Sequence, residues 1–204
     1  MNTYIQQLIL LIVPVLFSIT VHEVSHGYVA YRLGDPTAKN AGRLTLNPIK
    51  HIDIVGLLVL VITRMIGWAK PVPVDHRYFK NPRKDMMLVS LAGPASNLML
   101  AVAFALAYKV FGGMLMTAYL YPLSLMLQIM ISINVGLAIF NLIPIPPLDG
   151  SHIMEGLLPP EMAREYSKIA PYGFMILLIL IFTRVVDFVI FPIIRVIANL
   201  LLSL

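Results

Sequence analysis

The sequence predicts an all-α polytopic membrane protein, a helical bundle of four to six spans, in a single domain that covers residues 1–204. Hydrophobic residues make up 59% of the chain, charged residues only 12%, and the mean hydropathy is +0.85, which is far from the composition of a soluble domain. The apolar residues also form runs long enough to cross the hydrocarbon core of a bilayer as helices. We therefore expect the lipid bilayer to surround most of the chain.

The apolar runs locate the expected spans. Three core spans are predicted at about residues 4–33, 86–111 and 120–143, and an extra span at about residues 172–190. A C-terminal apolar helix is predicted at 191–204, where Pro192 and Arg195 favour a kinked or interfacial end over a further crossing.

The connection between the first two spans, residues 34–85, has a different composition, with several prolines and many charges. Within it, Arg43 to Leu46 and Lys70 to Val74 are predicted as short β-strands because turn residues flank them. Ile54 to Gly67 is apolar but short and is interrupted by Arg64, which predicts a re-entrant or interfacial segment.

The distribution of basic residues predicts the orientation. Ten lysines and arginines lie between Arg32 and Lys84, whereas none precedes His22. By the positive-inside rule, we expect a multi-pass protein of the cell membrane with its N-terminus outside and residues 34–85 on the cytoplasmic side. Because the basic residues flank spans and form no patch with interleaved aromatic residues, the net charge of +5 does not indicate nucleic-acid binding.

The segment His22-Glu23-Val24-Ser25-His26 ends the first apolar run. Residues four apart lie on the same face of a helix, so His22 and His26 can hold one metal ion, and Glu23 can reach a water molecule beside that ion. This layout is typical of a zinc site that activates water, and ionisable residues inside an apolar span are costly and usually functional. Its place in the span predicts a site near the cytoplasmic side.

Catalytic zinc sites usually have three protein ligands, so the two histidines require a partner. The sequence has no cysteine, which leaves His, Asp and Glu. Asp149 is the preferred candidate, because three prolines break the third span just before it and can turn its carboxylate inward. His76 is expected to be an exposed loop residue. The competing ligands that remain open are His51, His152, Glu155, Glu161 and Glu165.

Three segments together resemble a known family. They are His22 to His26, the sequence Ala92-Gly93-Pro94-Ala95-Ser96-Asn97 in the second span, and Asn141 to Gly150 in the third. In this order they are similar to the three signatures of the site-2 proteases, intramembrane zinc metalloproteases that are peptidase M50-like. The segments Gly42 to Pro48 and Gly67 to Val74 resemble a compact subgroup without a PDZ or CBS domain.

The resemblance implies one Zn²⁺ per chain, with His22, His26 and Asp149 as its ligands and Glu23 as the catalytic base and acid. It further implies that Asn141 binds the substrate backbone or the transition-state oxygen. Asn97 is a second candidate for substrate binding. Together with Gly93 and Pro94, it is equally a candidate for close helix packing, since small residues let spans approach each other.

The expected function is therefore hydrolysis of peptide bonds in or near the transmembrane segments of membrane protein substrates. The strand-like segments between Arg43 and Val74 could receive the unwound substrate as an added strand. With no room for a regulatory domain, control is expected from a regulatory membrane partner. Two alternatives stay open: a zinc or cation transporter, since His and Asp also line ion pathways, and an inactive membrane scaffold. Glu23→Gln separates transport from hydrolysis.

Overall fold

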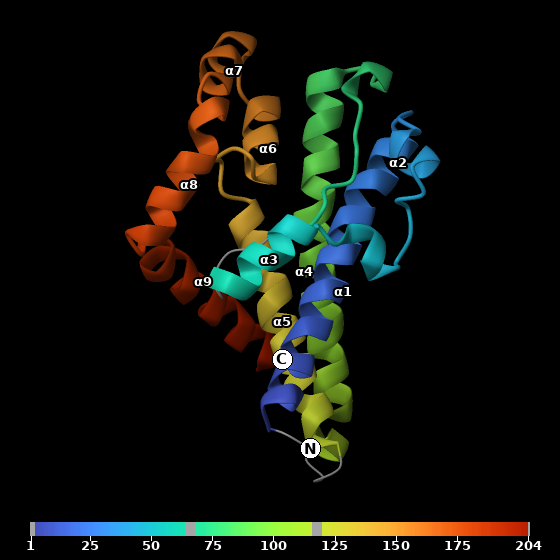
Figure 1. Ribbon diagram of the computed structural model, residues 1–204, viewed down its shortest axis with the longest axis vertical. Helices are drawn as coiled ribbons and strands as arrows, with labels where there is room; N and C mark the ends of the chain where they lie inside the picture. The colour runs from blue at the N-terminus through green and yellow to red at the C-terminus, as the bar shows by residue number, and fades with distance from the viewer. Residues whose placement is uncertain (1–2, 64–67, 116–119, 204) are drawn as a thin grey trace.

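The computed structural model of the chain describes residues 3–63, 68–115 and 120–203, and every element in these residues is a helix (Figure 1). The longer helices are α1 (Thr3–Arg32), α4 (Pro82–Leu115), α5 (Tyr121–Asn141), α8 (Gly173–Phe182) and α9 (Val185–Leu202). The shorter ones are α2 (Thr37–Asn40), α3 (Ile54–Thr63), α6 (Asp149–Leu157) and α7 (Pro160–Ser167), with 3₁₀ turns η1 (Pro48–His51), η2 (His76–Tyr78) and η3 (Ala170–Tyr172).

Helices α1, α4 and α5 lie where the three core spans were predicted. These helices run along the long axis of the molecule and pack against one another, and α4 also contacts α6 (Figure 1). Five helical segments of the described chain are long and apolar enough to cross a membrane. They are Leu10–Arg32, Pro82–Gly112, Tyr121–Asn141, Pro160–Phe182 and Val185–Leu202.

Small side chains occupy the contacts between the long helices. Ala101 and Ala138 are fully buried, and Ala105 and Ala198 cluster with Ile131. Large apolar side chains instead face outward, as Phe188 does with 87% of its surface exposed. In water this arrangement would be costly, whereas in lipid small residues let spans approach closely and large ones face the acyl chains.

The first span ends at a glycine turn. Gly34 has a φ of +108°, a conformation that suits glycine at a helix C-terminus, and Pro36 follows. Asp35, which lies between Gly34 and Pro36, is fully buried. Its carboxylate accepts hydrogen bonds from the backbone N–H of Thr37 at 2.9 Å and from that of Asp75 at 2.7 Å. This carboxylate therefore fastens the long connection to the end of α1.

The two β-strands predicted in the connection are not formed. Residues 43–46 and 70–74 lack strand pairing, and the nearest feature is an isolated bridge between Ile52 and Ala69. The reason is that Pro71 and Pro73 have no N–H, so the segment 70–74 cannot supply a ladder of hydrogen bonds. It is nevertheless extended, and it is held by bonds from Lys70 N–H to the His51 carbonyl and from Arg43 to the Lys70 carbonyl, at 2.9 and 2.7 Å.

The apolar part of the connection forms helix α3, which lies crosswise to the long helices (Figure 1). Its ten residues are too few to cross a bilayer, as expected for the predicted re-entrant or interfacial segment. The remainder of that prediction, residues 64–67, lies outside the described residues.

The predicted boundary between the last two apolar segments is wrong. The chain breaks at Thr183–Arg184 instead of at residue 191, because Arg184 adopts the left-handed conformation with a φ of +58° and ends α8. Pro192 lies inside α9, and the helix continues through it, as transmembrane helices often allow. Figure 1 shows α8 and α9 running from the end that holds α7 toward the end that holds the N-terminus.

Candidate metal centre

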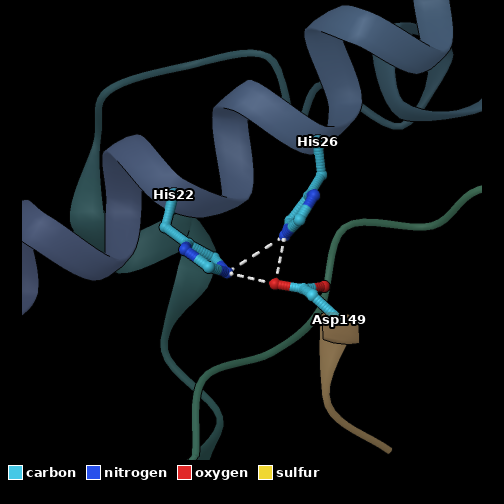
Figure 2. Close-up of side chains that lie close together, drawn as sticks. All are labelled: His22, His26 and Asp149. Carbon is cyan, nitrogen blue, oxygen red and sulfur yellow. Dashed lines mark hydrogen bonds and ion pairs between the residues drawn. The ribbon is translucent and has the colours of Figure 1, made fainter. Parts of the chain in front are cut away.

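Three side chains from distant parts of the sequence point toward one another (Figure 2). Nε2 of His22 and Nε2 of His26 are 3.0 Å apart, and Oδ2 of Asp149 lies 3.1 Å from the first and 3.3 Å from the second. In residues 3–63, 68–115 and 120–203, this is the one group of His, Asp and Glu side chains arranged to hold a metal ion.

The hydrogen-bond partners of the two rings determine which nitrogen carries a proton. Nδ1 of His26 lies 2.7 Å from the backbone carbonyl of Val89, and Nδ1 of His22 lies 2.6 Å from Oδ1 of Asn97. Because both partners can only accept, each neutral ring has its hydrogen on Nδ1 and a lone pair on Nε2. Two imidazole lone pairs and one carboxylate oxygen therefore face one another, and a cation is the species that satisfies all three.

The spacing of these atoms fits zinc. Tetrahedral zinc with bonds of about 2.0–2.1 Å places neighbouring ligand atoms about 3.3 Å apart. The three separations of 3.0, 3.1 and 3.3 Å are close to this value. Oδ2 of Asp149 is also buried and accepts no hydrogen bond, so it is free to bind a metal. The donor set of two imidazoles and a carboxylate is one that zinc prefers.

Helix α4 can approach the histidines because of a glycine. A β-carbon on Gly93 would lie 2.6 Å from Cε1 of His22 and would collide with the ring of His26. Hydrogen in place of a side chain at this position leaves room for both rings between α1 and α4. Gly93 therefore leaves the room that the rings of His22 and His26 need, in addition to the helix packing expected from the segment Ala92 to Asn97.

Asp149 is the first residue of α6, and the turn before it brings the carboxylate to α1. Gly150 packs so closely on the end of α5 that a β-carbon would overlap the carbonyls of Leu142 and Ile143. At the other end of α6, the guanidinium of Arg83 donates to the carbonyls of Gly156 and Leu158. The helix that carries Asp149 is thus fixed at both ends.

Glu23 faces a cavity of about 740 Å³ beside the three-atom cluster. Its Oε2 accepts a hydrogen bond of 2.8 Å from the backbone N–H of Val72, in the extended segment 70–74. The cavity is lined by His22, His26 and Asp149 together with apolar side chains such as Trp68, Phe140 and Phe174. A carboxylate, the candidate ligands and an apolar pocket are therefore adjacent.

The two asparagines proposed for substrate binding lie in different places. Asn141 lines the cavity at the end of α5, and its amide donates to the Leu137 carbonyl at 2.9 Å. Asn97 is fully buried behind His22 and does not line the cavity. The structure thus puts Asn97 next to an imidazole and Asn141 where a substrate chain could reach it.

The competing ligands lie outside the cluster. His51 is buried, with Nε2 2.9 Å from the Thr45 carbonyl, and His152 lines the cavity but has Glu155 3.5 Å from its Nδ1. Of the other two acids, Glu161 is exposed and Glu165 pairs with Lys168. The remaining histidine, His76, is exposed in η2, as expected.

Several residues around the centre were missed by the sequence analysis. Ser18 and Asn134 form a buried polar network with Asn97, while Val72 and Val89 contribute backbone atoms to Glu23 and His26. A polar residue in the middle of an apolar span was the available signal for Ser18 and Asn134. Backbone contacts such as those of Val72 and Val89 leave no signal in the side-chain pattern.

The fold and the site together define a class: a multi-pass membrane protein with the paired histidines, glutamate and distant aspartate of a zinc metalloprotease. Comparison with known proteins agrees. The sequence model of Peptidase family M50 matches residues 116–182. The chain is 44% identical to "Putative zinc metalloprotease YwhC" of Bacillus subtilis, over 89% of this chain and 84% of that protein.

A second relative is "Putative zinc metalloprotease Rip2" of Mycolicibacterium smegmatis, 32% identical over 89% of this chain and 70% of that protein. No solved structure matches the chain significantly. The chain belongs to peptidase family M50, the site-2 protease family, which confirms the resemblance seen in its three signatures.

Proposed function

We propose that this protein is a zinc endopeptidase that hydrolyses peptide bonds in or near the transmembrane segments of membrane proteins. The observation that carries the proposal is the convergence of Nε2 of His22, Nε2 of His26 and Oδ2 of Asp149 within 3.0–3.3 Å, next to a cavity that also contains Glu23. Family membership supports a protease, and the names of the relatives support zinc.

In this proposal, His22, His26 and Asp149 hold one Zn²⁺ per chain. When bound there, zinc supplies Lewis acidity, which polarises a carbonyl and lowers the pKa of water. Glu23 takes the proton of the attacking water on a carboxylate oxygen and returns it to the leaving nitrogen. The N–H of Val72 holds Oε2 of Glu23 and so orients the carboxylate. Asn141 is a candidate to bind the substrate backbone from the cavity wall.

The cavity supports an apolar polypeptide as the substrate. Its aromatic and aliphatic lining suits side chains taken from a transmembrane helix. Such a helix hides its carbonyls in hydrogen bonds and must unwind before it can be cleaved. The extended segment 70–74 passes Glu23, and its side chains Val72 and Val74 line the cavity, which supports a role in aligning an unwound chain.

We further propose a location for the site near the cytoplasmic side of the cell membrane, with the N-terminus outside. The basic connection between α1 and α4 supports this orientation, since ten lysines and arginines lie between Arg32 and Lys84. Figure 1 shows α2, α6 and α7 at the end of the bundle opposite the N-terminus. Regulation by a membrane partner stays a prediction.

The test compares zinc content and cleavage of a membrane-spanning peptide for purified wild type, Glu23→Gln and Asp149→Ala. Glu23→Gln should keep its zinc and lose about 10²- to 10⁴-fold of the cleavage rate. Asp149→Ala should lose both zinc and cleavage. His76 is an exposed histidine outside the cluster, so His76→Ala should behave as wild type. Cleavage by Glu23→Gln at the wild-type rate would contradict the proposal. Zinc uptake into liposomes that survives Glu23→Gln, without any cleavage, would favour a transporter.

A further inference from the structure

Three buried polar residues, Ser18, Asn97 and Asn134, form an amide network between α1, α4 and α5. Each has an exposed fraction of 0%, so none contacts lipid, solvent or the cavity. Asn97 donates to Oδ1 of Asn134 at 2.8 Å, and Asn134 donates to Oγ of Ser18 at 2.8 Å. Polar groups this deep in a bundle of spans are costly unless every hydrogen bond is made.

The orientation of both amides is fixed by backbone carbonyls, which can only accept hydrogen bonds. Nδ2 of Asn134 lies 2.8 Å from the Met130 carbonyl, so the nitrogen must be on that side and Oδ1 must face Asn97. Nδ2 of Asn97 then donates to that oxygen, and at 3.3 Å to the Ser18 carbonyl as well. Both hydrogens of Asn97 are used, and the amide cannot flip without losing both bonds.

The consequence reaches His22. With its nitrogen committed, Asn97 can present only Oδ1 to Nδ1 of His22, 2.6 Å away. An oxygen that only accepts requires a hydrogen on Nδ1, which leaves Nε2 as the lone pair that faces His26 and Asp149. The tautomer of this imidazole is therefore determined by Asn97, whose amide is oriented by Oδ1 of Asn134 at 2.8 Å and, over the longer distance of 3.3 Å, by the Ser18 carbonyl.

We propose that Asn134 is a positioning residue for the metal centre, which acts through Asn97 to hold His22 in the tautomer and ring orientation that bind zinc. The inference rests on the proposed function, in which His22 is a zinc ligand. Partners that orient a ligating histidine affect metal affinity by about 10- to 100-fold when they are removed. Asn97 is such a partner, because it contacts His22 directly. Asn134 contacts Asn97 instead, so its effect on zinc affinity passes through Asn97.

The chain offers a matched control on the same helix. Gln128 of α5 also makes polar contacts, with Oγ of the fully buried Ser124 and with the hydroxyl of Tyr108, both at 3.4 Å. Within residues 3–63, 68–115 and 120–203, no hydrogen bond joins this cluster to either histidine of the centre. Gln128→Leu therefore removes an amide from α5 as Asn134→Leu does, while leaving the amide network intact.

The experiment measures the zinc dissociation constant by chelator competition, and the unfolding temperature of the metal-free protein, for wild type and four variants. The variants are Asn134→Leu, Asn97→Leu, the double variant of both, and Gln128→Leu. Asn134→Leu should weaken zinc binding about tenfold and Asn97→Leu by about 10- to 100-fold. The double variant should bind zinc as Asn97→Leu does, because Asn134 acts only through Asn97. Gln128→Leu should match wild type.

Unchanged zinc affinity in Asn134→Leu would overturn the inference, even if the metal-free variant unfolds at a lower temperature, because that is the result for a purely structural role. Effects that add in the double variant would overturn it too. Should the leucine variant fail to fold, Asn134→Ala makes the same test without the added bulk. Wild type that binds no zinc would remove the proposed function itself, a result distinct from failure of the network.

Discussion

The bundle of α1, α4 and α5 and the C-terminal pair α8 and α9 are both apolar enough to cross a membrane, yet they are built differently. In the apolar window of α4, 39% of the residues are buried, against 6% in α9. The bundle contains the small residues and the polar contacts that tie α1 to α4 and α5, whereas α8 and α9 expose most of their large side chains.

This difference indicates which helices must be held in exact positions. The candidate ligands depend on close approach of α1, α4 and α6, and a shift of one ångström would separate atoms that are now 3.0–3.3 Å apart. By contrast, α8 contributes an apolar wall to the cavity through Phe174, for which exact position matters less. The bundle should therefore be sensitive to small substitutions, and the C-terminal pair tolerant of them.

Gly93→Ala should have the largest effect and tests the bundle at its closest point. The added methyl group would collide with the rings of both His22 and His26, so the rings must move and zinc affinity should fall by about 100-fold or more. Gly112→Ala is the control, because a β-carbon at this position of α4 meets nothing within 4 Å. Equal zinc affinity of the two variants, measured by chelator competition, would show that α4 does not confine the histidines.

Ile131→Ala and Phe188→Ala compare packing in the two regions directly. Ile131 of α5 is fully buried against Ala105 of α4 and the one small residue that α9 adds to this cluster, Ala198, and its truncation leaves a cavity that should cost about 2–5 kcal/mol of unfolding free energy. Phe188 on α9 is 87% exposed, and its truncation should change the free energy by no more than about 0.5 kcal/mol. Reversible unfolding in mixed micelles measures the free energy for both variants. A similar loss in the two would show that the bundle and the C-terminal pair do not differ in packing.

Val72→Pro affects the part of the site that lies outside the bundle. Proline suits this extended segment, which already contains Pro71 and Pro73, but it removes the N–H that donates to Glu23. Loss of a hydrogen bond to a charged group should lower the cleavage rate about 10- to 100-fold while zinc binding is retained. Val72→Ala keeps the N–H and serves as the control. Normal cleavage by the proline variant would mean that the contact has no part in catalysis.

The sequence predicted what depends on periodicity and local chemistry. Apolar runs located α1, α4 and α5 within a few residues, because hydrocarbon thickness sets the length of a span. The spacing of His22 and His26 placed both on one helix face, and the prolines before Asp149 indicated a turn toward them. All three side chains meet as expected, although their roles stay a proposal.

What the sequence did not predict depends on contacts between distant segments. The segment 70–74 is extended, but two of its five residues are prolines without an N–H, and its hydrogen bonds go to Glu23, His51 and Arg43 instead of to a partner strand. The break at Arg184 arises from one left-handed residue of a type that seldom adopts this conformation. The network around Asn134 requires knowing which faces of α4 and α5 meet, and this is a property of packing.

Acid unfolding should show the smallest effect, in the connection that joins the bundle to segment 70–74. Hydrogen bonds from the Arg77 guanidinium hold the pKa of Asp75 at about 2, below the usual value of 3.8. Since this native pKa is depressed, the contribution of Asp75 to stability is present above pH 3.8 and is lost as the pH falls toward 2.

Arg77→Ala removes the donor, so the pKa of Asp75 should return toward its usual value and the variant should unfold at slightly higher pH than wild type. Fluorescence of Trp68, the single tryptophan, follows the transition in micelles. The shift should be small because the Arg77 side chain is exposed and solvent screens the pair. Lys80→Ala, an exposed substitution close by in the connection, is the control. An identical acid midpoint for Arg77→Ala and Lys80→Ala would mean that the pair does not help to fasten the connection to the bundle.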